Sequence, residues 1–71
     1  MEVDEEKFNI SMRKFLKTVG ITSQQKIEAS IRNAQTNNMI LGDSIAISVN
    51  VQIKELDLNH SISGKIILKD T

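Results

Sequence analysis

The fold is decided by residues 45–68, IAISVNVQIKELDLNHSISGKIIL. Apolar residues occupy every second position on both sides of Lys54-Glu55, and polar residues fill most positions between them. Alternation over this length is typical of half-buried strands, because successive side chains of a strand point to opposite faces. We therefore predict an antiparallel β-hairpin with strands at residues 44–54 and 57–69 and one apolar face.

The turn between these strands has two solutions that keep both apolar sets on one face. A two-residue turn at Lys54-Glu55 pairs Ile53 with Leu56, whereas a four-residue loop over residues 54–57 preserves the same alternation. The sequence does not choose between them, because Lys54-Glu55 lacks the glycine of a favoured tight turn. In the second strand, Gly64 marks either a bulge or a close backbone approach.

The first half of the chain begins with a helical pattern over residues 5–19. The apolar residues recur at steps of three and four and form one stripe: Phe8, Met12, Phe15, Leu16 and Val19. We expect Asp4 to cap the N-terminus and Gly20 to supply the left-handed residue after the C-terminus. Ile10 lies nearly opposite the stripe, so this helix cannot bury it internally.

A second helix is predicted over residues 23–37, after a very short turn. Thr22 and Gln25 have the spacing of a capping box, and Asn37 or Asn38 can take a left-handed ending. We therefore predict a single α+β domain of all 71 residues. Two short helices form a helix-turn-helix-like corner that packs on one face of the C-terminal hairpin, in the order helix, helix, strand, strand.

The small size of the chain points to self-association. Folding of an 8.0 kDa chain into a compact monomer buries about 7,100 Å², worth on the order of 105 kcal/mol if about 60% is apolar. Ordering the chain costs about 105 kcal/mol, so the two terms cancel. Without cysteine and with one histidine, neither a disulfide nor a structural zinc is expected. Oligomerisation remains as the source of additional stability.

The cellular compartment is predicted from the N-terminal sequence, the apolar runs and the composition. No apolar run approaches the length of a membrane span, and the acidic N-terminus does not have the pattern of a secretory signal. Together with the absence of cysteine, these features predict a cytoplasmic protein that does not contact membranes.

The chain also resembles a known family from Phe8 onward. The strongest matches lie in the helical half: Phe8-Asn9, Ser11, Arg13 to Lys17, Val19-Gly20, Thr22 to Gln24 and Ile27-Glu28. Weaker matches follow at Gly42-Asp43, Leu56 to Leu58 and Gly64. On these residues the chain resembles short bacterial proteins known only as a domain of unknown function, whose members tend to have Pro-Gly where this chain has Lys54-Glu55. The resemblance implies an independent small domain and brings no activity, cofactor or catalytic residue.

Nucleic-acid binding is the alternative function that the sequence offers. The helical region is locally basic, and the candidate contact residues are Arg13, Lys14, Lys17, Lys26 and Arg32. A helix-turn-helix with the hairpin as a wing fits poorly, because Leu16 stands where that motif needs a small residue. Phosphate contacts dominate DNA affinity, yet the net charge is zero. The simpler interpretation, without nucleic-acid binding, is that these basic residues form a helix face exposed to solvent.

The single histidine is the main candidate for chemistry. With the two-residue turn, His60 points to the apolar face opposite Val49, with Asp57 and Glu55 nearby in sequence. One imidazole with scattered carboxylates is a poor metal or proton-transfer site, so we expect a partly buried structural histidine. The isolated glycines form no phosphate-binding loop. We therefore expect that the protein is not an enzyme and binds neither a metal ion nor a cofactor.

The outward face and the edges of the hairpin form the predicted interaction surface. Two strands alone are marginally stable and leave both edges open to further pairing. The predicted self-association residues are Ile10, Ser48, Asn50, Gln52, Ser61, Ser63 and Ile67. We expect a small non-enzymatic interaction module that forms a homodimer by strand pairing or by sheet contact.

Overall fold

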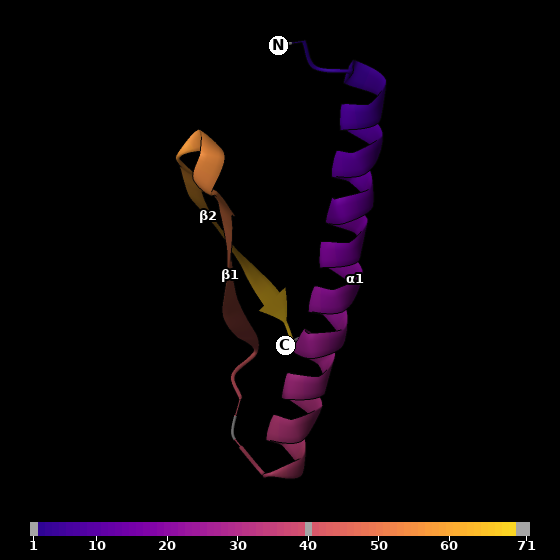
Figure 1. The fold of residues 1–71 in the computed structure, drawn as a ribbon. Coiled ribbons are helices and arrows are strands. Elements are labelled where there is room, and N and C mark those ends of the chain that lie inside the picture. The colour runs from indigo at the N-terminus through magenta and orange to yellow at the C-terminus, as the bar shows by residue number, and fades with distance from the viewer. Residues whose placement is uncertain (1, 40, 70–71) are drawn as a thin grey trace. The chain divides into compact units, whose positions relative to one another are not determined.

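The computed structural model describes residues 2–39 and 41–69 and has an α+β architecture (Figure 1). The elements in chain order are α1 (Glu5–Thr36), β1 (Ser44–Ile53), a short 3₁₀ helix (Lys54–Leu56) and β2 (Leu58–Ile67). They fall into two compact units, Met1–Met39 with the helix and Ile40–Thr71 with the hairpin. The predicted α+β class and the antiparallel hairpin are confirmed.

The helical unit consists of one continuous helix (Figure 1). This helix is 32 residues long. The prediction of two short helices at residues 5–19 and 23–37 is therefore wrong, and so is the helix-turn-helix-like corner. Gly20 does not have a positive φ and lies within the helix, as does Thr22. Glycine in a helix interior costs about 1 kcal/mol. Ending one helix and starting another costs more, because roughly four carbonyls and four N–H groups lose their intrahelical partners.

Both ends of α1 are capped by side chain or backbone. Asp4 is the N-cap, as predicted, and its Oδ1 accepts a hydrogen bond of 3.1 Å from the Lys7 N–H. At the other end Asn38 has a φ of 57°, which confirms the predicted left-handed ending. The Met39 N–H donates to the Ala34 carbonyl at 2.9 Å, the long bond of a Schellman motif.

The hairpin has the four-residue loop, not the two-residue turn. Ile53 lies opposite Leu58, so the pairing of Ile53 with Leu56 is wrong for this chain. The loop contains the 3₁₀ helix and ends at Asp57, whose φ is 52°. Aspartate tolerates this left-handed conformation better than most residues, which explains how the loop closes without a glycine.

The strands pair over ten residues each without a bulge, from Ser44 opposite Ile67 to Ile53 opposite Leu58. The pairing continues across Gly64, so of the two alternatives for this glycine the bulge is absent. β2 is shorter than the predicted strand at residues 57–69.

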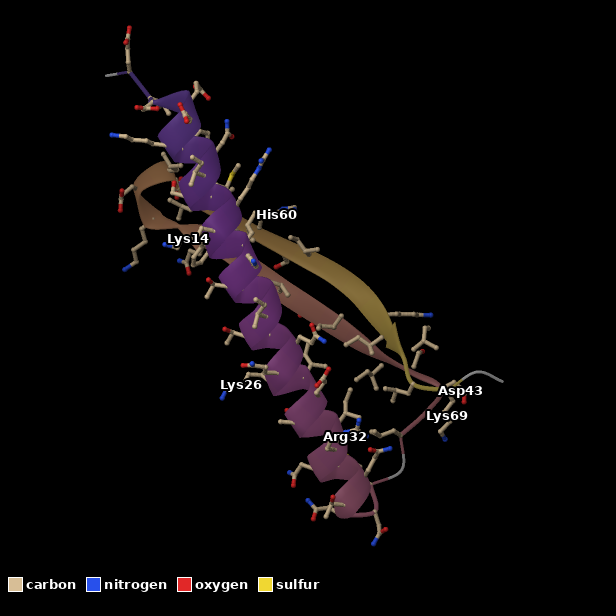
Figure 2. The ribbon with its side chains drawn as sticks, turned by 90° about the vertical axis from the view of Figure 1, so that its right-hand side faces the viewer. Lys14, Lys26, Arg32, Asp43, His60 and Lys69 are labelled. Carbon is tan, nitrogen blue, oxygen red and sulfur yellow. The ribbon has the colours of Figure 1, made fainter. Side chains whose placement is uncertain are left out.

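The chain beyond β2 still contacts the start of β1. The N–H groups of Leu68 and Lys69 both donate to the Asp43 carbonyl, at 2.7 and 3.1 Å. Figure 2 shows Asp43 and Lys69 side by side at this open end of the hairpin. Lys69 Nζ also reaches the Leu41 carbonyl at 3.5 Å.

No residue that the structure describes is buried. The large apolar side chains of both units keep much of their surface accessible, with Phe15 66% and Ile62 53% exposed. Neither a lone helix nor a two-stranded hairpin can enclose a core within itself. Packing of the helical residues on the hairpin stays a prediction.

Candidate interaction surface

The apolar face of the hairpin is formed by pairs of residues that lie directly opposite each other. From the open end to the loop these pairs are Ile45 with Ile66, Ile47 with Gly64, Val49 with Ile62, Val51 with His60, and Ile53 with Leu58. Residues opposite each other in an antiparallel pair share a face. The predicted coincidence of the two apolar sets is therefore confirmed, although with pairs that differ from those of a two-residue turn.

The opposite face of the hairpin carries hydroxyl and amide groups. Its central pairs are Ser48 with Ser63, Asn50 with Ser61, and Gln52 with Asn59. The Ser61 hydroxyl lies 3.3 Å from Asn50 Oδ1 and donates a hydrogen bond to it. The structure thus brings together on one face the predicted self-association residues Ser48, Asn50, Gln52, Ser61, Ser63 and Ile67. Ile10 belongs to α1, in the other unit, and is 60% exposed.

Each strand of the hairpin has one hydrogen-bonding partner among the described residues, so each has an outer edge. β1, SIAISVNVQI, contains no charged residue, no glycine and no proline. β2, LNHSISGKII, contains Lys65 and Gly64. Charge, above all lysine, is the usual means by which proteins prevent further pairing at a sheet edge. The two edges therefore differ in how open they are to another strand.

Four of the five predicted contact residues of α1 project toward one side of the helix, and Lys26 projects toward the other. Figure 2 shows Lys14, Lys26 and Arg32 spread along the helix. Lys26 follows Lys17 by nine residues, about two and a half helical turns, so these two project in opposite directions. The other candidates fall within an arc of about 100° that includes Lys17: Arg13, Lys14 and Arg32. The continuous helix also removes the turn that the winged helix-turn-helix interpretation required.

His60 is exposed and lies opposite Val51. Val49 is not its partner, because the four-residue loop shifts the register of the strands. The prediction of a partly buried histidine is also wrong: His60 lies on the apolar face, as predicted, but it is exposed there. Among residues 2–39 and 41–69, no group of three or more histidine, cysteine, aspartate or glutamate residues is placed to hold a metal ion. In the same residues no helix has the length and apolarity needed to cross a membrane.

The sequence interpretation missed two features that become visible in the structure. The first is the continuity of α1: Val19, Ile27 and Ile31 are separated by eight and four residues and lie on one side of the helix, so the apolar stripe resumes on the same side after Gly20. The second is the difference between the two edges, which depends on knowing that the sheet ends at β1 and β2.

The comparisons with known proteins agree with the resemblance noted from the sequence. No curated protein and no solved structure matches the chain. Residues 3–69 match the family of unknown function DUF6494. This match covers nearly the whole chain, so the protein belongs to the DUF6494 family, a family of unknown function.

Proposed function

We propose that the protein is a small non-enzymatic interaction module that acts as a homodimer. The observation that carries this proposal is the absence of a buried side chain among the described residues, together with the many large apolar residues that stay exposed. Apolar surface of this extent is typical of protein interaction sites. The two units supply it in different forms, an apolar stripe along α1 and an apolar face on the hairpin.

Energetic reasoning supports a second copy as the partner. The estimate for a compact monomer leaves almost no net stability, and the chain has no cysteine with which to form a disulfide. Association with a second copy removes further apolar surface from water and adds a favourable term of about 25 cal/mol for each Å² of apolar area buried. A dimer therefore supplies stability that a single copy lacks.

The oligomeric state tests this proposal directly. We expect light scattering or sedimentation equilibrium to give a mass of about twice 8.0 kDa at micromolar concentration. Because folding and association are coupled in such a dimer, the thermal midpoint should rise with protein concentration. A monomeric mass at high micromolar concentration, with a thermal midpoint that does not depend on concentration, would refute the proposal.

A further inference from the structure

The outer edge of β1 is the part of the hairpin that is most open to another strand. In an antiparallel pair each residue directs its N–H and C=O either toward the neighbouring strand or away from it, in alternation. Roughly half of the backbone groups of β1 therefore point away from β2, the only strand with which it pairs in the described part of the chain. Another extended strand can bond to these groups. A helix cannot, because its backbone bonds are already made within itself.

The composition of the two edges selects β1 over β2. The ten residues of β1 are uncharged, lack glycine and proline, and place a β-branched residue at every second position. Such segments pair readily with copies of themselves. β2 has a lysine at position 65, next to Gly64, which weakens a strand.

The spacing of the β-branched residues is symmetric about Val49. If Val49 lies opposite its own copy in an antiparallel pair, Ile47 lies opposite Val51, and Ile45 lies opposite Ile53. All five β-branched residues of β1 are then paired with one another, and the apolar face continues unbroken from one copy to the next.

Neighbouring symmetric registers lose this match. Centring the pair on Ser48 places Ile53 opposite Asp43, and centring it on Asn50 places Ile45 opposite Glu55. Each of these registers puts a carboxylate against an isoleucine of β1. The Val49 register places Asp43 opposite Glu55, but both lie beyond the ends of β1, and it alone pairs all five β-branched residues with one another, so Val49 is the favoured centre.

We propose that two copies of the chain pair through β1, antiparallel and with Val49 on the two-fold axis. The result is a four-stranded sheet in the order β2, β1, β1 and β2. This proposal rests on the proposed homodimer and assigns its interface. Sheets of three or more strands with an apolar face have the stability that an isolated hairpin lacks.

Disulfide crosslinking tests the interface, and the chain has no native cysteine to interfere. In the proposed register the two copies of residue 49 have Cα atoms about 4.5–5.5 Å apart, which suits a disulfide. Val49→Cys should therefore give a covalent dimer of about twice 8.0 kDa in a glutathione redox buffer. The matched control is Ile62→Cys. Ile62 lies directly opposite Val49 on the same face and is more exposed, 53% against 41%.

The control distinguishes the possible interfaces. Crosslinking of V49C with I62C remaining monomeric supports pairing through β1. Crosslinking of I62C alone assigns the interface to the edge of β2, and equal crosslinking of both assigns it to stacked apolar faces; either result overturns the proposal. A dimeric mass with no crosslink in either variant also overturns it and leaves the homodimer intact. A monomeric mass for the unmodified protein removes the homodimer itself.

A pair of charged variants provides an independent test that leaves the apolar face intact. In the proposed register Ser48 lies opposite Asn50 of the second copy, so S48K/N50K places lysine against lysine twice at the interface. We expect the dimer dissociation constant to rise about tenfold or more. The control is S61K/S63K, which alters the β2 partners of the same two residues. It also loses the hydrogen bond between Ser61 and Asn50, yet should leave the dissociation constant unchanged. Equal weakening by both variants would overturn the proposal.

Discussion

The helix and the hairpin differ in what each leaves unsatisfied. α1 closes its backbone hydrogen bonds internally, and its ends are completed by the Asp4 side chain and the left-handed Asn38. The hairpin satisfies one side of each strand and leaves the other side open. Both units expose apolar side chains, but among the described residues only the hairpin also offers a row of unpaired backbone groups along an extended strand. The hairpin is therefore the unit with directional hydrogen-bonding groups for recognising a partner, whereas α1 offers apolar side chains.

The prediction with the largest expected effect tests whether α1 and the hairpin fold independently of each other. Gly20→Pro removes a helix N–H and brings the proline ring against the Leu16 carbonyl, which should cost about 3 kcal/mol or more. Circular dichroism should show a large loss of helical signal. The amide signals of β1 and β2 should persist in NMR spectra, since the ladder bonds that the structure describes for these strands join β1 to β2.

Gly20→Ala is the matched control for this substitution. A Cβ at this position would have no heavy atom within 4 Å outside the local helix backbone, so alanine should stabilise α1 by about 0.5–1 kcal/mol. If the hairpin signals disappear in G20P, the two units depend on each other and the contrast between them fails. If G20A destabilises the helix, Gly20 has a role that the continuous helix does not explain.

The difference between local and distant interactions also decides how much the sequence could predict. The apolar alternation of β1 and β2 and the caps at Asp4 and Asn38 are local patterns, and the structure confirms them. The end of a helix at Gly20 was a local signal too, but helix formation is cooperative. The cost of one glycine is smaller than the cost of two new helix ends, and no short window of sequence contains that balance.

The candidate interface could be predicted in part. Residue parity alone placed Ser48, Asn50, Ser61 and Ser63 on one face, and the register confirms that placement. The length of the hairpin loop could not be predicted, because aspartate at position 57 indicates a left-handed residue more weakly than glycine does. The preference for β1 over β2 as an interface required the observation that the sheet has two strands.

A second prediction tests the loop that fixes the register of the hairpin. Asp57 has a φ of 52°, and its N–H donates to the Lys54 carbonyl at 3.1 Å. Asp57→Val should destabilise the hairpin by about 1–2 kcal/mol, because a β-branched residue is strained in the left-handed region. Amide hydrogen exchange in β1 and β2 would measure the loss. Asp57→Gly, which relieves the strain, should not accelerate exchange; if it does, the Asp57 side chain has a further role.

A third prediction tests the cap of α1. Asp4→Ala removes the acceptor of the hydrogen bond from the Lys7 N–H and should cost about 1 kcal/mol of helix stability. The measurement is the helical circular dichroism signal during thermal unfolding. Asp4→Asn is the control, because asparagine caps helices about as well as aspartate. An equal loss in D4A and D4N would show that the charge near the helix dipole matters more than the cap.

The smallest expected effect concerns Gly64, in the strand that we assign to the outside of the four-stranded sheet. Gly64 lies opposite Ile47, and an added Cβ would lie 3.8 Å from Ile47 Cγ2, an ordinary contact distance. Gly64 has no positive φ, so alanine fits its backbone. Gly64→Ala should stabilise the hairpin by about 0.5 kcal/mol, measured by slower amide exchange in β2. A loss of stability would mean that another chain segment approaches this position closely, which would place a partner over the apolar face as well as at the edge of β1.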